Sequence, residues 1–254
     1  MKTEHHEIVS KVPEVTLIFW IIKIFATTVG ETAGDLVSMA MNIGYLISSI
    51  IFAVIFITVV SLQINARTFN VFIYWATIIA TTTLGTTIAD FTDRSLGIGY
   101  AGGSTLLFVL LMLSLFIWRN SVGSVSIQQI RSPKAEMFYW ITILFSQTLG
   151  TALGDWVADT EGLGYATSAL LFSAVLISIA IVYFTTAVSH TVLFWAAFIF
   201  TRPLGAVVGD FLDKPVAEGG LALSHLGITS LLLTLMLILI FSFKPVSYTH
   251  LRAH

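Results

Sequence analysis

The sequence lacks cysteine and has few charged residues. None of its 254 residues is Cys, and only 10% are Asp, Glu, Lys or Arg. The absence of Cys excludes a disulfide framework and a thiolate metal site. The scarcity of charge, together with 56% hydrophobic residues and a mean hydropathy of +0.92, argues against a soluble domain. We therefore expect an integral membrane protein whose partner is the lipid bilayer.

Signatures of enzymes and of nucleic-acid-binding proteins are also missing. The chain has no phosphate-binding loop, no nucleophile elbow and no zinc-binding helix. The histidines His190 and His225 stand alone and form no metal motif. We expect a protein that is not an enzyme, needs no cofactor and binds no nucleic acid.

What the chain does contain is one motif in four copies. In each copy a Gly is followed five residues later by Asp, and a Trp precedes that Gly by ten residues. Another Gly follows the Asp by nine residues in every copy. The copies of the central motif occupy residues 27–35, 83–90, 148–155 and 203–210. Fixed offsets in four copies indicate a fourfold internal repeat.

Hydrophobic runs come in pairs, two in each repeat. Each run is close to the ~20 residues that a membrane-spanning helix needs. We predict one transmembrane domain, residues 1–243, with repeats at about 12–62, 67–118, 132–184 and 189–243. The predicted helices are 14–38, 44–62, 68–92, 98–118, 134–158, 164–184, 189–212 and 221–243. The expected fold is an all-α membrane protein of eight transmembrane helices, built as a ring of four parallel two-helix repeats.

The distribution of basic residues predicts the orientation. Eight Lys and Arg residues fall at the termini and between repeats, whereas only Arg94 and Lys214 fall in the turns inside repeats. Under the positive-inside rule both termini are cytoplasmic. The last residues, 244–254, resemble translated sequencing-adapter read-through. We exclude this non-native-looking tail from the fold.

A polar stripe runs along the first helix of each repeat. Thr27, Glu31 and Asp35 are spaced i, i+4 and i+8, so they share one helix face. Carboxylate and threonine oxygens suit hard cations such as Mg²⁺, Ca²⁺ or Mn²⁺, and the four motif aspartates are the candidate metal ligands. The predicted substrate-binding residues are Asp35, Asp90, Asp155, Asp210, Glu31, Arg202, Thr27, Thr82 and Gln147.

The aspartates have a second interpretation, in which each lies at the outer interface and only shapes a solvated turn. A carboxylate near a helix C-terminus is disfavoured by the helix dipole, so its recurrence suggests a compensating cation or a cap for the next segment. Glu31 lies one turn deeper, where ionisable groups are functional candidates. Arg202 is expected to pair with a ring carboxylate, and Lys23 either snorkels or has a function. These charges break the fourfold pattern and favour one asymmetric site.

Seven glycines in the first helices are expected to serve helix packing. They form small-x-x-x-small motifs, which let two backbones approach closely. The alternative is that they break or hinge the helix and expose carbonyls beside a substrate. These glycines are Gly30, Gly34, Gly85, Gly150, Gly154, Gly205 and Gly209.

The repeated Thr-Leu-Gly-x-x-x-Gly-Asp pattern resembles a family of multi-spanning bacterial inner-membrane proteins catalogued as uncharacterised "membrane-anchored" proteins. The resemblance covers residues 12–243 and implies a bacterial plasma-membrane location. The segment from Glu31 to Asp35 also resembles, more weakly, the E-x-G-D motif of cation exchangers. It contains one extra residue and the other three copies lack the Glu, so we do not transfer the exchanger mechanism.

The leading hypothesis is a secondary transporter or exporter of a small cation, either a divalent metal or a proton-coupled solute. The repeated aspartates and Glu31 would line its path. The alternative is a non-transporting membrane scaffold or sensor whose glycine motifs serve helix packing.

Overall fold

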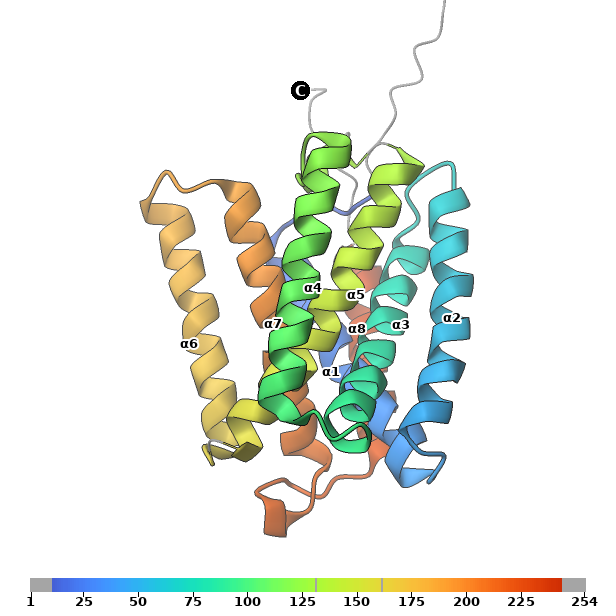
Figure 1. Ribbon diagram of the computed structural model, residues 1–254, viewed down its shortest axis with the longest axis vertical. Helices are drawn as coiled ribbons and strands as arrows, with labels where there is room; N and C mark the ends of the chain where they lie inside the picture. Colours follow the sequence, from blue (N-terminus) through green and yellow to red (C-terminus); the bar gives the residue numbers. More distant parts are fainter. Residues whose placement is uncertain (1–10, 131, 161, 244–254) are drawn as a thin grey trace, which may run out of the picture.

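Eight long helices make up most of the described chain (Figure 1). The computed structural model describes residues 11–130, 132–160 and 162–243, so the predicted tail at 244–254 lies outside the described residues. All eight predicted helices are present within these ranges. They are α1 (Leu17–Asp35), α2 (Tyr45–Asn65), α3 (Val71–Asp90), α4 (Gly99–Val122), α5 (Pro133–Asp155), α6 (Gly164–Thr185), α7 (His190–Asp213) and α8 (His225–Phe243).

Seven of these helices are long and apolar enough to cross a membrane, which supports a multi-pass membrane protein. The exception is α5, which is as long as the others but carries more polar side chains. Lys134 and Glu136 lie in its first turn, and Gln147 and Asp155 lie further along. The prediction of eight helices is therefore confirmed, whereas only seven meet the criterion for a span.

Local sequence explains where the helices begin and how the chain turns. Thr16, Asn70 and Ser132 cap α1, α3 and α5 by accepting hydrogen bonds from backbone N–H groups of the first turn. The glycine that follows each motif Asp by nine residues has a positive φ, between 71° and 88°, in all four repeats. Glycine adopts this conformation without strain, which explains why it recurs at the turn between the two helices.

The first helix of three repeats changes its geometry directly after the motif aspartate. α1, α3 and α5 end as α-helices at Asp35, Asp90 and Asp155, and each continues as a π-helical turn of five residues. In the fourth repeat α7 continues as an α-helix to Asp213. π-helical turns are rare in proteins, and those that occur are often found at functional sites.

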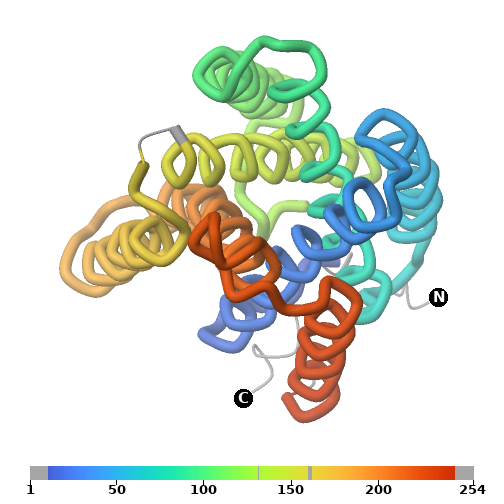
Figure 2. The backbone as a smooth tube through the Cα atoms, turned by 90° about the horizontal axis from the view of Figure 1, so that it is seen from below, coloured from blue at the N-terminus to red at the C-terminus, as the bar shows by residue number. Residues whose placement is uncertain are grey.

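The first helices form a closed central ring, and the second helices surround it. α1, α3, α5 and α7 pack side by side in that order, and α7 returns to α1. Each outer helix packs on the inner helix of the next repeat, so that α2 lies on α3, α4 on α5, α6 on α7 and α8 on α1. Figure 2 shows the outer helices arranged around the inner ring. The polar stripes thus belong to the inner helices.

Glycines let the inner helices approach closely, and each helix continues unbroken through them. A Cβ atom added at the first glycine of each motif would collide with the next inner helix. The residue that it meets holds the same position in every repeat, the position of Thr27. The four contacts are Gly30 with Thr82, Gly85 with Gln147 and the adjacent Thr148 backbone, Gly150 with Arg202, and Gly205 with Thr27. The continuous helices differ from the helix-breaking alternative.

Aromatic rings close the end of the inner ring where the inner helices begin. In each repeat the residue before the motif Trp contacts the motif Trp of the next repeat, and the contacts return from the fourth repeat to the first. The pairs, with the distances between ring centroids, are Phe19–Trp75 (5.4 Å), Tyr74–Trp140 (5.6 Å), Tyr139–Trp195 (6.2 Å) and Phe194–Trp20 (5.8 Å). We call these eight residues the aromatic girdle. The tryptophans therefore serve packing between repeats.

Candidate functional site

The four motif aspartates gather at the other end of the inner ring, and all four are buried. Two basic residues bridge them in pairs. Arg94 contacts Asp90 at 3.2 Å and Asp155 at 3.5 Å. Lys214 contacts Asp210 at 3.3 Å and also pairs with Asp35. The aspartates are thus not four separate solvated turns, and each has a compensating cation.

The bridging cations follow their own aspartates by four residues. This spacing places Arg94 beside Asp90 and Lys214 beside Asp210 on the same side of the helix. Both cations lie at the C-terminal end of an inner helix, where the helix dipole favours positive charge. Burial alone would lower the pKa of Lys214, but Asp210 and Asp35 outweigh this effect and raise that pKa above its ordinary value. The two carboxylates therefore favour the ammonium form of Lys214.

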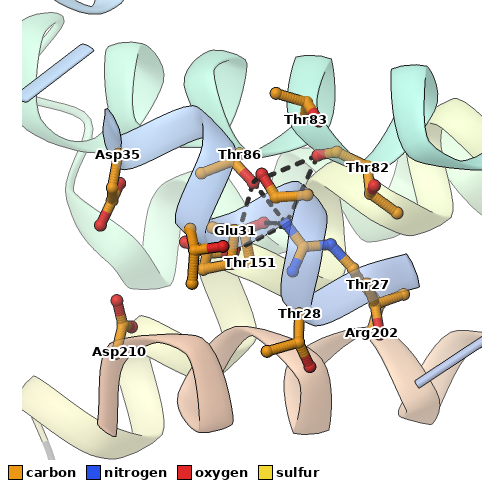
Figure 3. A network of polar contacts seen from close by, with 12 residues as sticks. Thr27, Thr28, Glu31, Asp35, Thr82, Thr83, Thr86, Thr151, Arg202 and Asp210 are labelled. Carbon is orange, nitrogen blue, oxygen red and sulfur yellow. Dashed lines mark hydrogen bonds and ion pairs between the residues drawn. The ribbon is translucent and has the colours of Figure 1, made fainter. Parts of the chain in front are cut away.

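A second buried ion pair lies one helical turn deeper in the ring (Figure 3). Arg202 on α7 reaches Glu31 on α1 at 2.8 Å, as expected from the sequence. The same nitrogen of Arg202 donates to the hydroxyls of Thr86 on α3 and Thr151 on α5, both at 2.6 Å. One side chain therefore joins all four inner helices.

Three carboxylates of this region approach one another closely enough to share one ion. Oxygen atoms of Glu31, Asp35 and Asp210 all lie within 4.8 Å of one another, and all three residues are buried. Ligands on opposite sides of a Ca²⁺ ion are about 5 Å apart, because each lies 2.3–2.6 Å from the metal. The cluster has the dimensions of a site for one small cation, and two of its three residues are those that Lys214 contacts.

The remaining predicted site residues lie in the layer of Arg202. Thr27 and Thr82 are buried, and their hydroxyls donate to backbone carbonyls of their own helices. Gln147 is fully buried, and its amide finds no hydrogen-bond partner among the described residues. The Nε and Nη1 atoms of Arg202 are also buried without a partner in that part of the chain. Asp90 and Asp155 join the site through Arg94 and not through the three-carboxylate cluster.

Lys23 lies deeper still, on the side of the aromatic girdle. It is fully buried, so it does not snorkel to an interface. Its amine donates to the hydroxyl of Thr201 at 2.8 Å and to the carbonyl of Phe198 at 3.2 Å, and it lies 3.8 Å from the centroid of the Phe198 ring. Lys23 therefore attaches α1 to α7.

Several functional candidates were missed by the sequence analysis. Arg94 and Lys214 served there only to orient the protein, although their i+4 spacing from an aspartate was a usable signal. Thr86 and Thr151 lie on the predicted polar stripe, one turn before the aspartates, but were not among the predicted binding residues. Their role depends on the reach of Arg202 across the ring, which spacing along one helix does not reveal.

Together these observations define a multi-pass helical membrane protein, built from internal repeats, with charged side chains buried at its centre. Comparison with protein families gives a more specific assignment. A family model described as "Repeat of Unknown Function (DUF347)" matches residues 18–69, 73–122, 138–189 and 193–244. The matches cover most of the chain, so the protein belongs to this repeat family. No curated protein and no solved structure matches it significantly.

Proposed function

We propose that this protein is a secondary transporter of a small cation, with the binding site formed by Glu31, Asp35 and Asp210. A divalent metal is the preferred cargo. The observation that carries the proposal is the convergence of these three buried carboxylates to within 4.8 Å of one another. Oxygen ligands at this spacing suit hard divalent cations, and ionisable groups buried within spans mark ion pathways in membrane proteins.

The charge balance of the site also supports a cation cargo. The four motif aspartates and Glu31 supply five buried carboxylates. Arg94, Lys214 and Arg202 supply three cations that pair with them. With all of these groups ionised, the cluster carries two net negative charges while Lys214 is paired and three once its ammonium group has moved away. One divalent cation in the place of Lys214 then leaves one negative charge, which a proton neutralises. Because burying uncompensated charge is unfavourable, the excess of carboxylates over cations favours the binding of a further cation.

Lys214 occupies the place of the cargo in this proposal. Its ammonium group bonds Asp35 and Asp210, the two aspartates of the three-carboxylate cluster. A metal ion entering the cluster displaces this ammonium group, and Lys214 returns when the metal leaves. Lys214 directly follows the end of α7 and is joined to Pro215, so its side chain can swing away without unwinding the helix.

We further propose that all eight helices span the bacterial inner membrane with both termini in the cytoplasm. α5 is the eighth span, because it holds the same place in the ring as α1, α3 and α7, and its polar residues Gln147 and Asp155 are buried there. The aromatic girdle then closes the cytoplasmic end of the path, and the bridged aspartates close the outer end. In this arrangement the path is closed at both ends, as an alternating-access transporter requires between its open states.

Flux through reconstituted vesicles tests this proposal. The wild type should admit Mn²⁺, Ca²⁺ or Mg²⁺ down an imposed gradient, as reported by an ion-sensitive dye inside the vesicles. The variant D35N/D210N should fall to the rate of empty vesicles. Glu218→Gln is the matched control, because Glu218 is an exposed acidic residue in the loop after α7. All variants must elute as the same monodisperse species by size exclusion.

The scaffold alternative makes the opposite prediction. The close approach of glycines to neighbouring helices is the observation that favours it. If the repeats exist only to pack, D35N/D210N should behave like the wild type and no ion should cross in either protein. That result, with correctly folded protein, would remove the transport proposal.

A further inference from the structure

We propose that the ring moves as two rigid halves that do not follow the order of the repeats. The terminal half consists of α1, α6, α7 and α8, and the middle half consists of α2, α3, α4 and α5. The ionic contacts between inner helices of different repeats lie inside these halves among the described residues. The two interfaces between the halves, α1–α3 and α5–α7, are the surfaces that part.

The terminal half is held together by charged side chains along its whole depth. Between α7 and α1, Lys214 pairs with Asp35 at one end, and Arg202 pairs with Glu31 at 2.8 Å near the centre. Towards the aromatic girdle, Lys23 donates to Thr201 at 2.8 Å. Breaking a buried ion pair without replacing it is strongly unfavourable, so these two helices stay together in the empty state. A cation bound to Glu31, Asp35 and Asp210 would bridge the same two helices in place of Lys214.

The middle half has matching contacts between α3 and α5. Arg94, just beyond α3, contacts Asp155 at 3.5 Å at the acidic end. At the opposite end the hydroxyls of Tyr74 and Tyr139 are 2.7 Å apart. This interface is therefore also fastened at both ends.

The interfaces between the halves have a different character. Between α1 and α3, Thr82 donates to the carbonyl of Ala26 at 3.3 Å, and Thr86 donates to Glu31 at 3.2 Å. Between α5 and α7, Arg202 donates to Thr151. All of these hydrogen bonds involve threonine hydroxyls, and no ion pair joins either pair of helices in the described part of the chain. Such contacts can be exchanged for others without leaving a buried charge unpaired.

The outer helices follow the same division. Because each outer helix packs on the next inner helix, α2 and α4 belong with α3 and α5, and α6 and α8 belong with α7 and α1. Two of their polar contacts agree with this division. Tyr45 on α2 bonds Arg94, and Thr229 on α8 bonds Thr32 on α1. Among the described residues, one ion pair crosses between the halves: Lys11, in the segment before α1, pairs with Glu136 at the start of α5, outside the inner ring. Lys11 also donates to the carbonyls of Gln63 and Ile64 on α2, and Trp195 on α7 donates to the carbonyl of Val125 in the segment between α4 and α5.

Arg202 contacts both halves. Its guanidinium pairs with Glu31 inside the terminal half and reaches across to Thr86 and Thr151 in the middle half. A cation that binds Glu31 competes with Arg202 for this carboxylate. Loading of the site would then change the contacts across both interfaces, which links the motion to the cargo.

Spin-label distances in the cysteine-free chain test the two halves directly. Labels at exposed Leu106 on α4 and Leu170 on α6 report across the halves. A label at Ile51 on α2, paired with Leu106, reports within the middle half, and one at Leu235 on α8, paired with Leu170, reports within the terminal half. Double electron–electron resonance is recorded for each pair in nanodiscs, with chelator and with saturating Mg²⁺, at acidic and neutral pH.

The proposal predicts two distance populations for the pair across the halves, with proportions that change between conditions. Each pair within a half should keep one distance throughout. The proposal would be overturned if each of the three pairs kept one unchanging distance. It would also be overturned if the distance of a pair within one half changed as much as the distance of the pair across the halves. The measurement does not depend on transport: a changing distance across the halves in a protein without cation flux would refute the proposed function and leave the two-half motion intact.

Discussion

Substituting Arg202, or removing its charged partner, should destabilise the inner ring more than a change at any other residue. Its guanidinium is fully buried, and Glu31 is its one carboxylate partner among the residues that the structure describes. Replacing Glu31 by Gln leaves the charge of Arg202 buried and unpaired, which should destabilise the fold by about 3–5 kcal/mol. The measurement is the thermal denaturation midpoint in detergent. The double variant E31Q/R202M should recover most of the loss, because it removes both charges. A double variant no more stable than E31Q would contradict this account of the pair.

The charged residues also mark how far the sequence alone could predict the site. The polar stripe was visible because Thr27, Glu31 and Asp35 follow helical spacing within one helix. The pairing of Arg202 with a ring carboxylate was also predicted and is confirmed. The bridge from Arg94 to Asp155 could not be predicted, because it joins two helices whose relative rotation depends on the packing of the whole ring.

At the scale of the helix, the glycines set how closely the inner helices can pack. A side chain at Gly150 would collide with Arg202 and Pro203 on α7. Gly150→Leu should therefore cost about 3 kcal/mol through overpacking and reduce the yield of monodisperse protein on size exclusion. Gly227→Leu on α8 is the control, since that position is exposed and its built Cβ makes only ordinary contacts. Equal yields for both variants would contradict the packing role.

A disulfide across one interface of the ring tests whether that interface must open. A Cβ built at Gly154 lies 3.2 Å from the Cβ of Ala206, close to the spacing of a disulfide. Oxidised G154C/A206C should reduce cation flux to the rate of empty vesicles, and a reductant should restore it.

The matched control lies inside the middle half, where the hydroxyls of Ser114 and Thr142 are 3.1 Å apart. Oxidised S114C/T142C should transport at the wild-type rate. Inhibition by both disulfides would mean that helices inside a half also separate.

The helices themselves were predictable, but their arrangement was not. Apolar runs and the recurring glycines predicted all eight helices with similar ends. Tertiary packing decides which outer helix covers which inner helix. α2 packs on α3 of the following repeat, and hydropathy along the chain contains no signal for that choice. α5 also shows that a helix buried by its neighbours can be less apolar than a lipid-facing span.

At the scale of the whole molecule, the aromatic girdle and the bridged aspartates enclose the polar centre from its two ends. Trp140 is almost fully buried in the girdle and contacts Tyr74 and Tyr139. Trp140→Ala should remove the seal at that end, so that protons leak into vesicles whenever the bridged aspartates open, at a rate above that of the wild type, as a pH-sensitive dye would report. Trp156→Ala, in the π-helical turn at the opposite end of α5, should not raise the leak. An unchanged leak in Trp140→Ala would show that the girdle does not seal the path.

The most direct test of the account is the equilibrium binding of Mn²⁺ to the purified protein, measured by titration calorimetry. The account predicts saturable binding to one site in the wild type and loss of that binding in D35N/D210N. It also predicts tighter binding in Lys214→Met, because this change removes the ammonium group that competes for Asp35 and Asp210. Absence of saturable binding in both the wild type and Lys214→Met, or binding that D35N/D210N leaves unchanged, would contradict the cation site.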